Sequence, residues 1–139
     1  MKVTAIFKGR AGIGAKVQGE ALVASDGFSA RYDLDRSQGI FSRPTHQLAG
    51  QSYVGKILVL DIAKGGVASA WMLHEMMKCN KAPLALVLNK ANPVLAQGAA
   101  FGRIPLIDRF DVDITQVITT GDWLAVDPGE AIVSLLEQE

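Results

Sequence analysis

The chain has 139 residues, enough for one domain with its own core, and 49% of them are apolar. Fourteen Lys and Arg residues balance 14 Asp and Glu residues, so the formal net charge is zero. A neutral chain without a basic stripe argues against nucleic-acid binding, which needs positive charge along one face.

Membrane and secreted classes are also disfavoured. The longest apolar runs, residues 57–60 and 84–88, are far shorter than the roughly 20 residues that cross a bilayer. The N-terminal apolar stretch is cut off by Lys8, unlike that of a signal peptide. The single cysteine, Cys79, can form neither an internal disulfide nor a zinc site by itself. We therefore expect a cytoplasmic domain that occupies residues 1–139 and binds neither nucleic acid nor membrane.

The N-terminal third is predicted to hold two strands and a long loop. Residues 3–8 and 19–24 are short β-branched or apolar runs, and the glycine-rich stretch 9–14 separates them as a loop. Residues 25–52 are rich in polar and turn-forming residues, which predicts a loop with room for one short strand. A loop of this length in a compact domain is usually functional or ordered by a partner.

The middle of the chain predicts a strand–helix–strand unit. Residues 56–63 (KILVLDIA) are the pattern of a strand buried on both faces. Two glycines follow, and residues 67–80 then carry apolar side chains at helical spacing. A second buried strand is expected at 84–89, so the crossover makes the two strands parallel neighbours.

The C-terminal third predicts a helix, a strand and a hairpin. Pro93 suits the first turn of a helix that runs to about residue 101, and residues 104–107 form a short strand. Residues 122–127 and 131–136 are expected to pair around a type II turn at Pro128-Gly129. The predicted fold class is α/β, with a central parallel βαβ unit flanked by antiparallel strands from both ends.

The sharpest local feature is the turn at residues 63–69 (AKGGVAS), where a buried strand leads into a helix. Glycines let the backbone approach a ligand, and the first N–H groups of a helix are unpaired at the positive end of its dipole. Lys64 adds a positive charge and Ser69 a hydroxyl. Alternatively, Gly65 and Gly66 only make the turn, and Ser69 satisfies a helix N-terminal donor.

The other groups of potentially functional residues give no clear indication of a site. His46, His74 and Cys79 are scattered, so the sequence spells out no metal cluster. Three carboxylates follow the strand at 104–107, where α/β sheets bind ligands, although a solvated rim is the simpler interpretation: Asp108, Asp111 and Asp113. Four large apolar residues of the first helix are expected in the core: Trp71, Met72, Met76 and Met77. Without a complete catalytic set, the chain is expected to contribute part of an active site to something else.

Several segments, read in order over residues 9–127, resemble the small swivel-domain subunit of the aconitase X family of dehydratases. They are GR at 9–10, GEALV at 19–23, GKILVL at 55–60, APLALVL at 82–88, NPVLAQGA at 92–99, IPLIDR at 104–109 and TGD at 120–122. The resemblance implies a swivelling β/β/α domain, which agrees with the elements predicted above.

The resemblance also implies a partner and a reaction. The partner is a large subunit that holds an iron–sulfur cluster or an iron ion and most substrate contacts, while this chain itself binds no cofactor. The reaction is a hydro-lyase step that removes water from a small hydroxy acid; family substrates include a hydroxyproline and a phosphorylated mevalonate. The metal would act as a Lewis acid on the departing hydroxyl while a base removes the neighbouring proton.

One departure from the family pattern concerns the base. The family turn reads Pro-Ser-Gly-Lys/Arg-Gly-Ser, and its last serine is thought to be the base from the swivel domain. Here residues 61–66 read DIAKGG, so Lys64 and Gly65 match but Gly66 replaces the serine. Ser69 could offer its hydroxyl from about one helical turn away, and it is our candidate catalytic residue. The departure could instead mark a divergent branch or an inactive paralogue.

The candidate substrate-binding residues are therefore Lys64, Gly65 and Gly66, which form the turn itself. Arg10 and Arg31 are further candidates, because a guanidinium can pair with a carboxylate in a bidentate manner.

Two alternatives remain open. Residues 65–69 (GGVAS) fit the turn of mobile phosphohistidine domains, but the phosphorylated position is Ala70, and without an imidazole there is no nucleophile. A non-catalytic binding or regulatory module that kept the swivel fold is the other alternative, and the missing serine favours it.

Overall fold

The strands and helices follow the predicted order along the chain. A computed structural model describes residues 2–64 and 66–137. Its elements are β1 (Lys2–Lys8), β2 (Ala11–Ile13), β3 (Val17–Val23), β4 (Leu34–Asp35), β5 (Ile40–Phe41), β6 (Ile57–Ile62), α1 (Val67–Lys78), β7 (Ala85–Lys90), α2 (Pro93–Gly102), β8 (Leu106–Asp108), α3 (Ile114–Val117), β9 (Trp123–Asp127) and β10 (Ile132–Glu137).

Within these described residues, eight strands form one sheet in the order β1-β10-β9-β3-β6-β7-β8-β2. β3, β6, β7 and β8 are parallel neighbours, which confirms the predicted βαβ crossover through α1. β10 pairs antiparallel with β1 on one side and with β9 on the other. At the far edge of the sheet, β2 pairs antiparallel with β8. The expected α/β class with flanking antiparallel strands is therefore confirmed.

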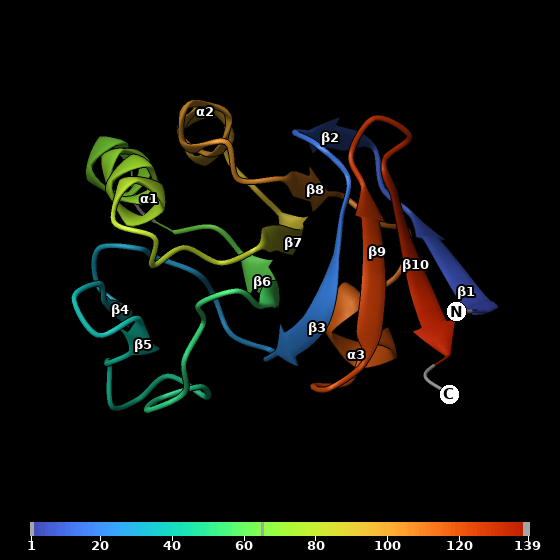
Figure 1. Ribbon diagram of the computed structural model, residues 1–139, viewed down its shortest axis with the longest axis horizontal. Helices are drawn as coiled ribbons and strands as arrows, with labels where there is room; N and C mark the ends of the chain where they lie inside the picture. The colour runs from blue at the N-terminus through green and yellow to red at the C-terminus, as the bar shows by residue number, and fades with distance from the viewer. Residues whose placement is uncertain (1, 65, 138–139) are drawn as a thin grey trace.

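β3 belongs to both halves of the sheet. Its residues 17–20 pair antiparallel with β9, and its residues 21–23 pair parallel with β6. The sheet bends between these two registers, so that β9 and β10 lie across one face of the parallel strands, as Figure 1 shows on the right. This bend creates three layers: α1 and α2, the parallel strands, and the antiparallel strands.

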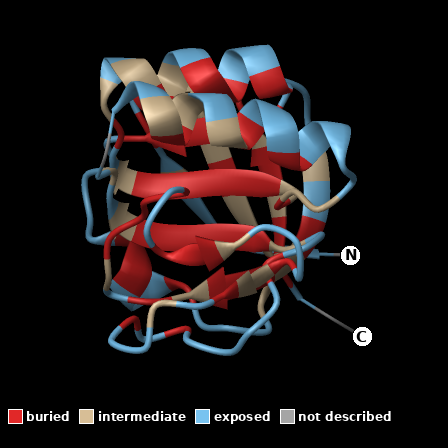
Figure 2. Ribbon diagram, turned by 90° about the vertical axis from the view of Figure 1, so that its left-hand side faces the viewer, coloured by how far each residue is buried: buried red, intermediate tan, exposed pale blue. Residues whose placement is uncertain are grey.

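The parallel strands are buried on both faces. Alternate residues of β6 point to opposite sides: Leu58 and Leu60 join one apolar cluster, whereas Ile57 and Val59 join the other. All four side chains are 0% exposed. The first cluster lies under α1 and α2, and the second lies against α3 and the antiparallel strands. Figure 2 shows the same division, with buried strands beneath helices whose outer faces are exposed. The continuous apolar run that predicted this strand thus fills two cores.

Three local predictions need correction. The glycine-rich stretch 9–14 is not simply a loop, because it contains β2; a Cβ at Gly12 would lie 2.2 Å from the Pro128 carbonyl oxygen. The hairpin turn is not type II, since Gly129 is absent from the positive-φ residues and Ala131 has the left-handed φ of 55° instead. Helix α3 was not expected; Asp113 begins it by accepting a hydrogen bond from the Thr115 N–H.

The loop at 25–52 differs in detail from the prediction. It contains two strands of two residues, β4 and β5, which pair with each other as a separate two-stranded sheet, and Ile40 of β5 also forms a bridge with Ser52. Separately, no described helix is long and apolar enough to cross a bilayer.

Tyr53 gives a stability prediction. Its side chain is 0% exposed, and its hydroxyl has no hydrogen-bond partner among the described residues. A buried, unpaired hydroxyl destabilises the fold, so Tyr53→Phe should raise the free energy of unfolding at pH 7 by about 1 kcal/mol.

Burial also raises the pKa of Tyr53 to about 12. The wild type should therefore lose stability as the pH rises from about 10 towards 12, because the unfolded tyrosine ionises first, and the variant should lack this loss.

Denaturant unfolding at pH 7 and above pH 10 measures both effects. Tyr32→Phe is the control, because Tyr32 is 66% exposed and its ring is retained. A Tyr53→Phe protein that is less stable than the wild type at pH 7 would contradict the prediction.

Candidate functional site: the turn between β6 and α1

The turn after β6 leaves the N-terminus of α1 without a cap. Gly66 is the N-cap residue, with no side-chain hydrogen bond to the helix, and the first turn of α1 holds no acidic residue. By contrast, Asn92 caps α2 and Asp113 caps α3 through their side chains. The free N–H groups and the positive dipole end of α1 are therefore available to an anion. Gly65, a predicted binding residue, lies outside the described residues.

Lys64 is held at this turn by its backbone. Its N–H donates to the Phe28 carbonyl (2.8 Å), and the Phe28 N–H donates to the Ile62 carbonyl (2.9 Å). The side chain of Lys64 is exposed, and among the described residues it makes no ion pair. The structure thus places an exposed lysine, without an ion pair among the described residues, two residues before the uncapped N-terminus of α1.

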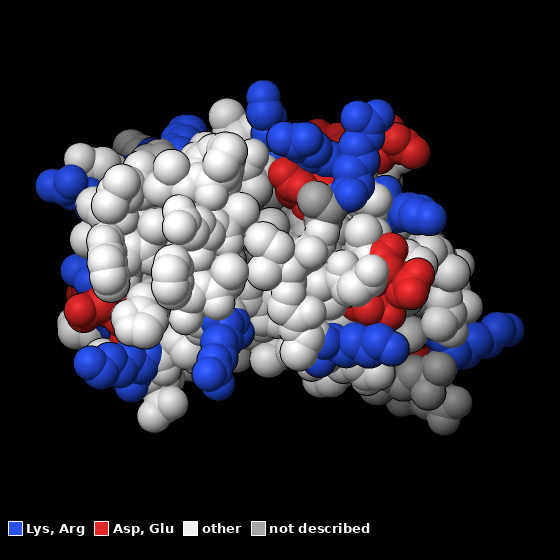
Figure 3. Space-filling view, turned by 90° about the horizontal axis from the view of Figure 1, so that it is seen from above, with Lys and Arg blue, Asp and Glu red and all other residues white. Residues whose placement is uncertain are grey.

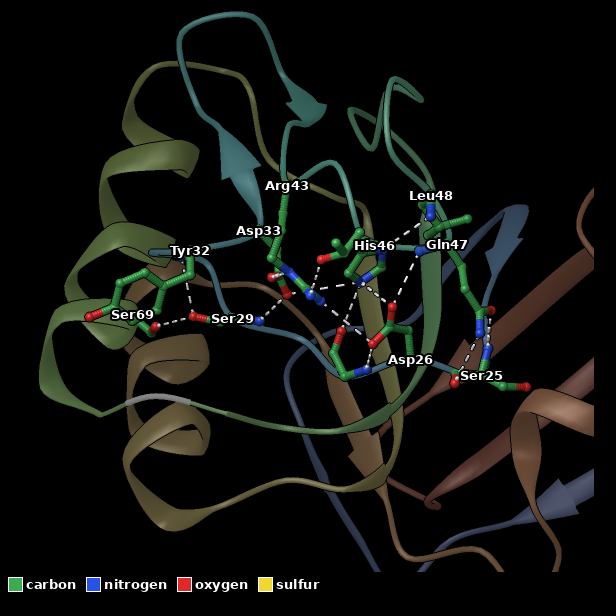
Figure 4. A network of polar contacts seen from close by, with 12 residues as sticks. Ser25, Asp26, Ser29, Tyr32, Asp33, Arg43, His46, Gln47, Leu48 and Ser69 are labelled. Atoms are coloured by element: carbon green, nitrogen blue, oxygen red, sulfur yellow. Dashed lines mark hydrogen bonds and ion pairs between the residues drawn. The ribbon is translucent and has the colours of Figure 1, made fainter.

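Ser69 lies on the inner side of α1. It is 2% exposed, and its hydroxyl oxygen is 3.4 Å from the hydroxyl oxygen of Ser29. Figure 4 shows the two hydroxyls facing each other beneath the helix. The structure therefore separates Ser69 from Lys64, because the serine points inward and the lysine outward.

The two predicted arginines lie in different places. Arg10 is exposed, and its N–H donates to the Asp108 carbonyl (3.0 Å) at the carboxyl end of β8. β8 is two strands from β6 along the same edge of the sheet, which corresponds to about 10 Å between strand axes. Arg31 is exposed in the loop at 25–52, with its guanidinium 5.2 Å from the centre of the Tyr32 ring. Arg10 thus shares the edge of the sheet with Lys64, whereas Arg31 belongs to the neighbouring loop.

A buried polar network within the loop at 25–48 was missed by the sequence analysis. His46 is buried, and its ring stacks on Phe41 with 4.6 Å between ring centres. Its Nδ1 accepts the Leu48 N–H (3.0 Å), so Nε2 carries the proton of a neutral ring and donates to the Gly27 carbonyl (2.9 Å). The imidazole therefore fixes the loop rather than facing a ligand.

Charged groups complete this network. Asp33 is 3% exposed; its carboxylate accepts the Ser29 N–H (2.9 Å) and binds Arg43 Nε at 2.6 Å, and this last bond raises the pKa of Arg43. Burial pushes the pKa of Asp26 upward, but hydrogen bonds from the Gly27 and Gln47 N–H groups outweigh it and leave the pKa below its ordinary value. Figure 4 shows these residues converging from one loop. Contacts among its own residues thus order the loop. The polar composition of the loop was visible in the sequence, but the pairing of these residues could not be predicted from it.

Two of the three carboxylates at the end of β8 and beyond it, Asp108 and Asp113, have structural partners. Asp108 is 5% exposed and accepts the Ala91 N–H (2.9 Å) before α2. Asn89 donates to both Asp113 (2.8 Å) and Asp61 (2.9 Å), which ties the ends of β6 and β7 to α3. Within the described residues, no three His, Cys, Asp or Glu side chains come together as a metal site.

An apolar groove of about 410 Å³ runs between α1 and α2 and begins at the same turn. Val67 and Trp71 are each 65% exposed and Phe101 is 70% exposed. The prediction that Trp71 lies in the core is wrong, as is that for Met77, which is 38% exposed; Met76 is buried as expected. Helix α1 has a buried side towards the sheet and a second apolar side towards α2. Figure 3 shows the surface over these helices, on the left, as a broad area without charge.

Comparisons with known proteins agree with this architecture. A family model described as the aconitase X swivel domain matches residues 6–135. The phosphomevalonate dehydratase small subunit of Methanosarcina mazei is 33% identical over 95% of this chain and 92% of its own length. That of Thermococcus kodakarensis is 34% identical over 94% of this chain and 96% of its own.

A solved structure agrees as well. A chain of the crystal structure of Thermococcus kodakaraensis aconitase X in its holo-form superposes with a TM-score of 0.89 and 33% identity, covering 96% of this chain and all of that one. The expected fold and the expected class of protein, one subunit of a dehydratase, are confirmed. The chain belongs to the aconitase X family, as its swivel domain.

Proposed function

We propose that this chain is the small subunit of a dehydratase that removes water from a phosphorylated hydroxy acid, with phosphomevalonate as the first candidate. The observation that carries the proposal is the exposed, unpaired ammonium of Lys64 beside the uncapped N-terminus of α1. The names of the similar small subunits support the choice of substrate. In this proposal residues 1–139 form a single swivel domain of a cytoplasmic enzyme.

The turn suits a phosphate or a carboxylate. Backbone N–H groups at a helix N-terminus bind anions, and a lysine adds a compact positive charge. Lys64, Gly65 and Gly66 are the proposed binding residues, and Arg10 could reach a second acidic group of the substrate from the end of β8. Arg31 stays a weaker candidate, because its guanidinium lies near the Tyr32 ring.

The proton-transfer role of Ser69 stays a prediction with a structural condition. The hydroxyl is buried against Ser29, and no described carboxylate or imidazole hydrogen-bonds to it. A serine hydroxyl is a weak base unless a neighbouring group takes its proton. Catalysis by Ser69 therefore requires that the first turn of α1 shifts when the enzyme assembles and that the large subunit supplies the activating group.

The iron expected in this family belongs to the large subunit in our proposal. When bound, such a metal acts as a Lewis acid on a departing hydroxyl. The described residues of this chain bring no suitable set of ligands together, so its own part is to bind and orient the substrate.

The groove between α1 and α2 supports an assembled enzyme. Exposed Val67, Trp71 and Phe101 surround an uncharged depression that starts where the substrate turn ends. A partner that holds the substrate against Lys64 has to lie over this turn and extends naturally onto the groove. Exposed apolar patches of this kind mark protein–protein contacts.

A non-catalytic binding module is the second candidate. Gly66 in place of the family serine and the burial of Ser69 favour it. A module of this kind would keep the anion-binding turn and the partner but would support no turnover.

The first prediction concerns assembly and activity. Affinity purification of this chain from its native host should retrieve a stoichiometric large subunit of roughly three times its size that carries iron, as expected for a domain that completes another chain's site. The complex should dehydrate phosphomevalonate. A colourless chain recovered alone or only as a homo-oligomer would contradict the proposal, and an iron-bearing complex inactive on all hydroxy acids would favour the non-catalytic module.

The second prediction concerns Ser69. If its hydroxyl handles the proton, Ser69→Ala in the assembled enzyme should lower kcat by about 100-fold or more with little change in KM. Ser29→Ala is the matched control, because it removes the same serine–serine contact but keeps the Ser69 hydroxyl. Full activity of Ser69→Ala, or an equal loss in Ser29→Ala, would show that the serine has only a structural role.

The third prediction concerns the groove. Trp71→Ser should raise the Kd for the large subunit by about tenfold or more, because exposed aromatic residues dominate such interfaces. Its circular dichroism spectrum should match that of the wild type, since the side chain is mainly exposed. Ile6→Ser on β1, where Ile6 is 61% exposed, serves as the control. Equal Kd values for the wild type and Trp71→Ser would place the interface elsewhere.

A further inference from the structure

A short segment of the loop continues the sheet beyond β3 and runs beside the turn. The Asp61 N–H donates to the Asp26 carbonyl (2.8 Å), and residues Phe28 and Ala63 form a parallel bridge. Residues 26–28 therefore lie alongside residues 61–64, with Gly27 between the two ends of this contact. The loop thus reaches the substrate turn through backbone pairing.

Gly27 makes room for the side chain of Lys64. Gly27 is buried, and an added Cβ would lie 2.7 Å from Lys64 Cε and 3.1 Å from Lys64 Cδ. It would also lie 3.2 Å from the Ile62 carbonyl oxygen. The end of the aliphatic stem of Lys64 therefore lies against the backbone of residue 27, and any side chain at this position would displace it.

Residue 27 is itself held firmly. Its carbonyl accepts the hydrogen bond from buried His46 Nε2 (2.9 Å), and its N–H donates to the Asp26 carboxylate (2.8 Å). Both partners belong to the network that orders the loop. Gly27 thus forms a rigid platform under a flexible side chain.

We propose that Gly27 is a positioning residue for Lys64: the His46-anchored backbone at residue 27 directs the lysine ammonium towards the anionic group of the substrate. This proposal rests on the proposed function, in which Lys64 binds that group. Lysine loses much rotamer entropy when it is fixed, so a surface that restricts its stem before binding strengthens the binding. The loop, which is distant in sequence, would then tune affinity without touching the substrate.

Gly27→Ala tests the proposal, because the group it displaces is the flexible end of Lys64 and the fold can be kept. In the complex with the large subunit, with phosphomevalonate as substrate, it should raise KM by about tenfold and leave kcat nearly unchanged. Lys64→Ala should raise KM at least as much. The double variant should resemble Lys64→Ala alone, because Gly27 acts only through Lys64.

Gly129→Ala is the control, since a Cβ there makes ordinary contact at 3.6 Å with Asp127. It should match the wild type in KM, and both glycine variants should melt within about 3 °C of the wild type. Additive effects of Gly27→Ala and Lys64→Ala, or an unchanged KM in Gly27→Ala, would overturn the proposal.

A second measurement separates this proposal from the proposed function. In the full chain with ¹³C-dimethylated lysines, the Lys64 signal, assigned with Lys64→Arg, should shift and become more mobile in Gly27→Ala but not in Gly129→Ala. An unchanged Lys64 signal would overturn the positioning role even if the enzyme proved inactive on phosphomevalonate. A changed signal in an inactive enzyme would support the positioning of Lys64 and refute only the substrate.

Discussion

The burial of β6 on both of its faces is the constraint from which the rest of this molecule follows. Its alternating side chains fill two separate cores. A shift in register by one residue would therefore move each set of side chains into the opposite core. The residues that follow it are therefore fixed in space, and so is the start of α1. Because β3 pairs with β6 only through residues 21–23, the antiparallel strands fold back over the second core. The position of β6 thus determines where the turn between β6 and α1, helix α1 itself and the antiparallel layer lie.

The loop at 25–48 is stabilised differently, by pairing of the polar side chains that it buries. It buries a carboxylate, that of Asp33, and a histidine, His46, near the turn between β6 and α1, which is costly unless each group is paired. Asp33 is paired with Arg43 and with a backbone N–H, and His46 uses both ring nitrogens on the backbone. This pairing orders the loop although it contains little regular secondary structure beyond β4 and β5. A rigid loop can then support residues 61–64 as firmly as a neighbouring strand would.

The sequence predicted those parts of the fold that depend on local pattern. The apolar runs of β6 and β7 and the intervening helix identified the parallel unit, since burial on both faces leaves a continuous apolar run. Features that depend on contacts between residues distant in the sequence were not predicted. Gly12 looked like part of a loop, but its lack of a side chain admits the Pro128 carbonyl at a sheet edge. Trp71 was expected in the core as a large apolar residue of the first helix, yet it is 65% exposed and lines the groove. Among the candidate site residues, the sequence identified the turn between β6 and α1, and its role in binding stays a prediction. The inward orientation of Ser69 and the closeness of Gly27 to Lys64 could not be predicted, because they depend on a loop some 40 residues away.

The chemistry that the turn can perform follows from what it holds and what it lacks. Lys64 and the helix N-terminus supply positive potential, and the described residues of the first turn of α1 hold no carboxylate, so in our proposal this face stabilises and orients an acid group. Glycine at position 66 lacks the hydroxyl of the last serine in the family pattern, and the hydroxyl of Ser69 is turned towards Ser29. The proposed binding residue, Lys64, is therefore exposed, whereas the proposed proton-transfer residue, Ser69, is buried. In our proposal, an enzyme assembled from this chain binds its substrate partly through Lys64, and the step that breaks the C–H bond depends on how the large subunit meets the first turn of α1.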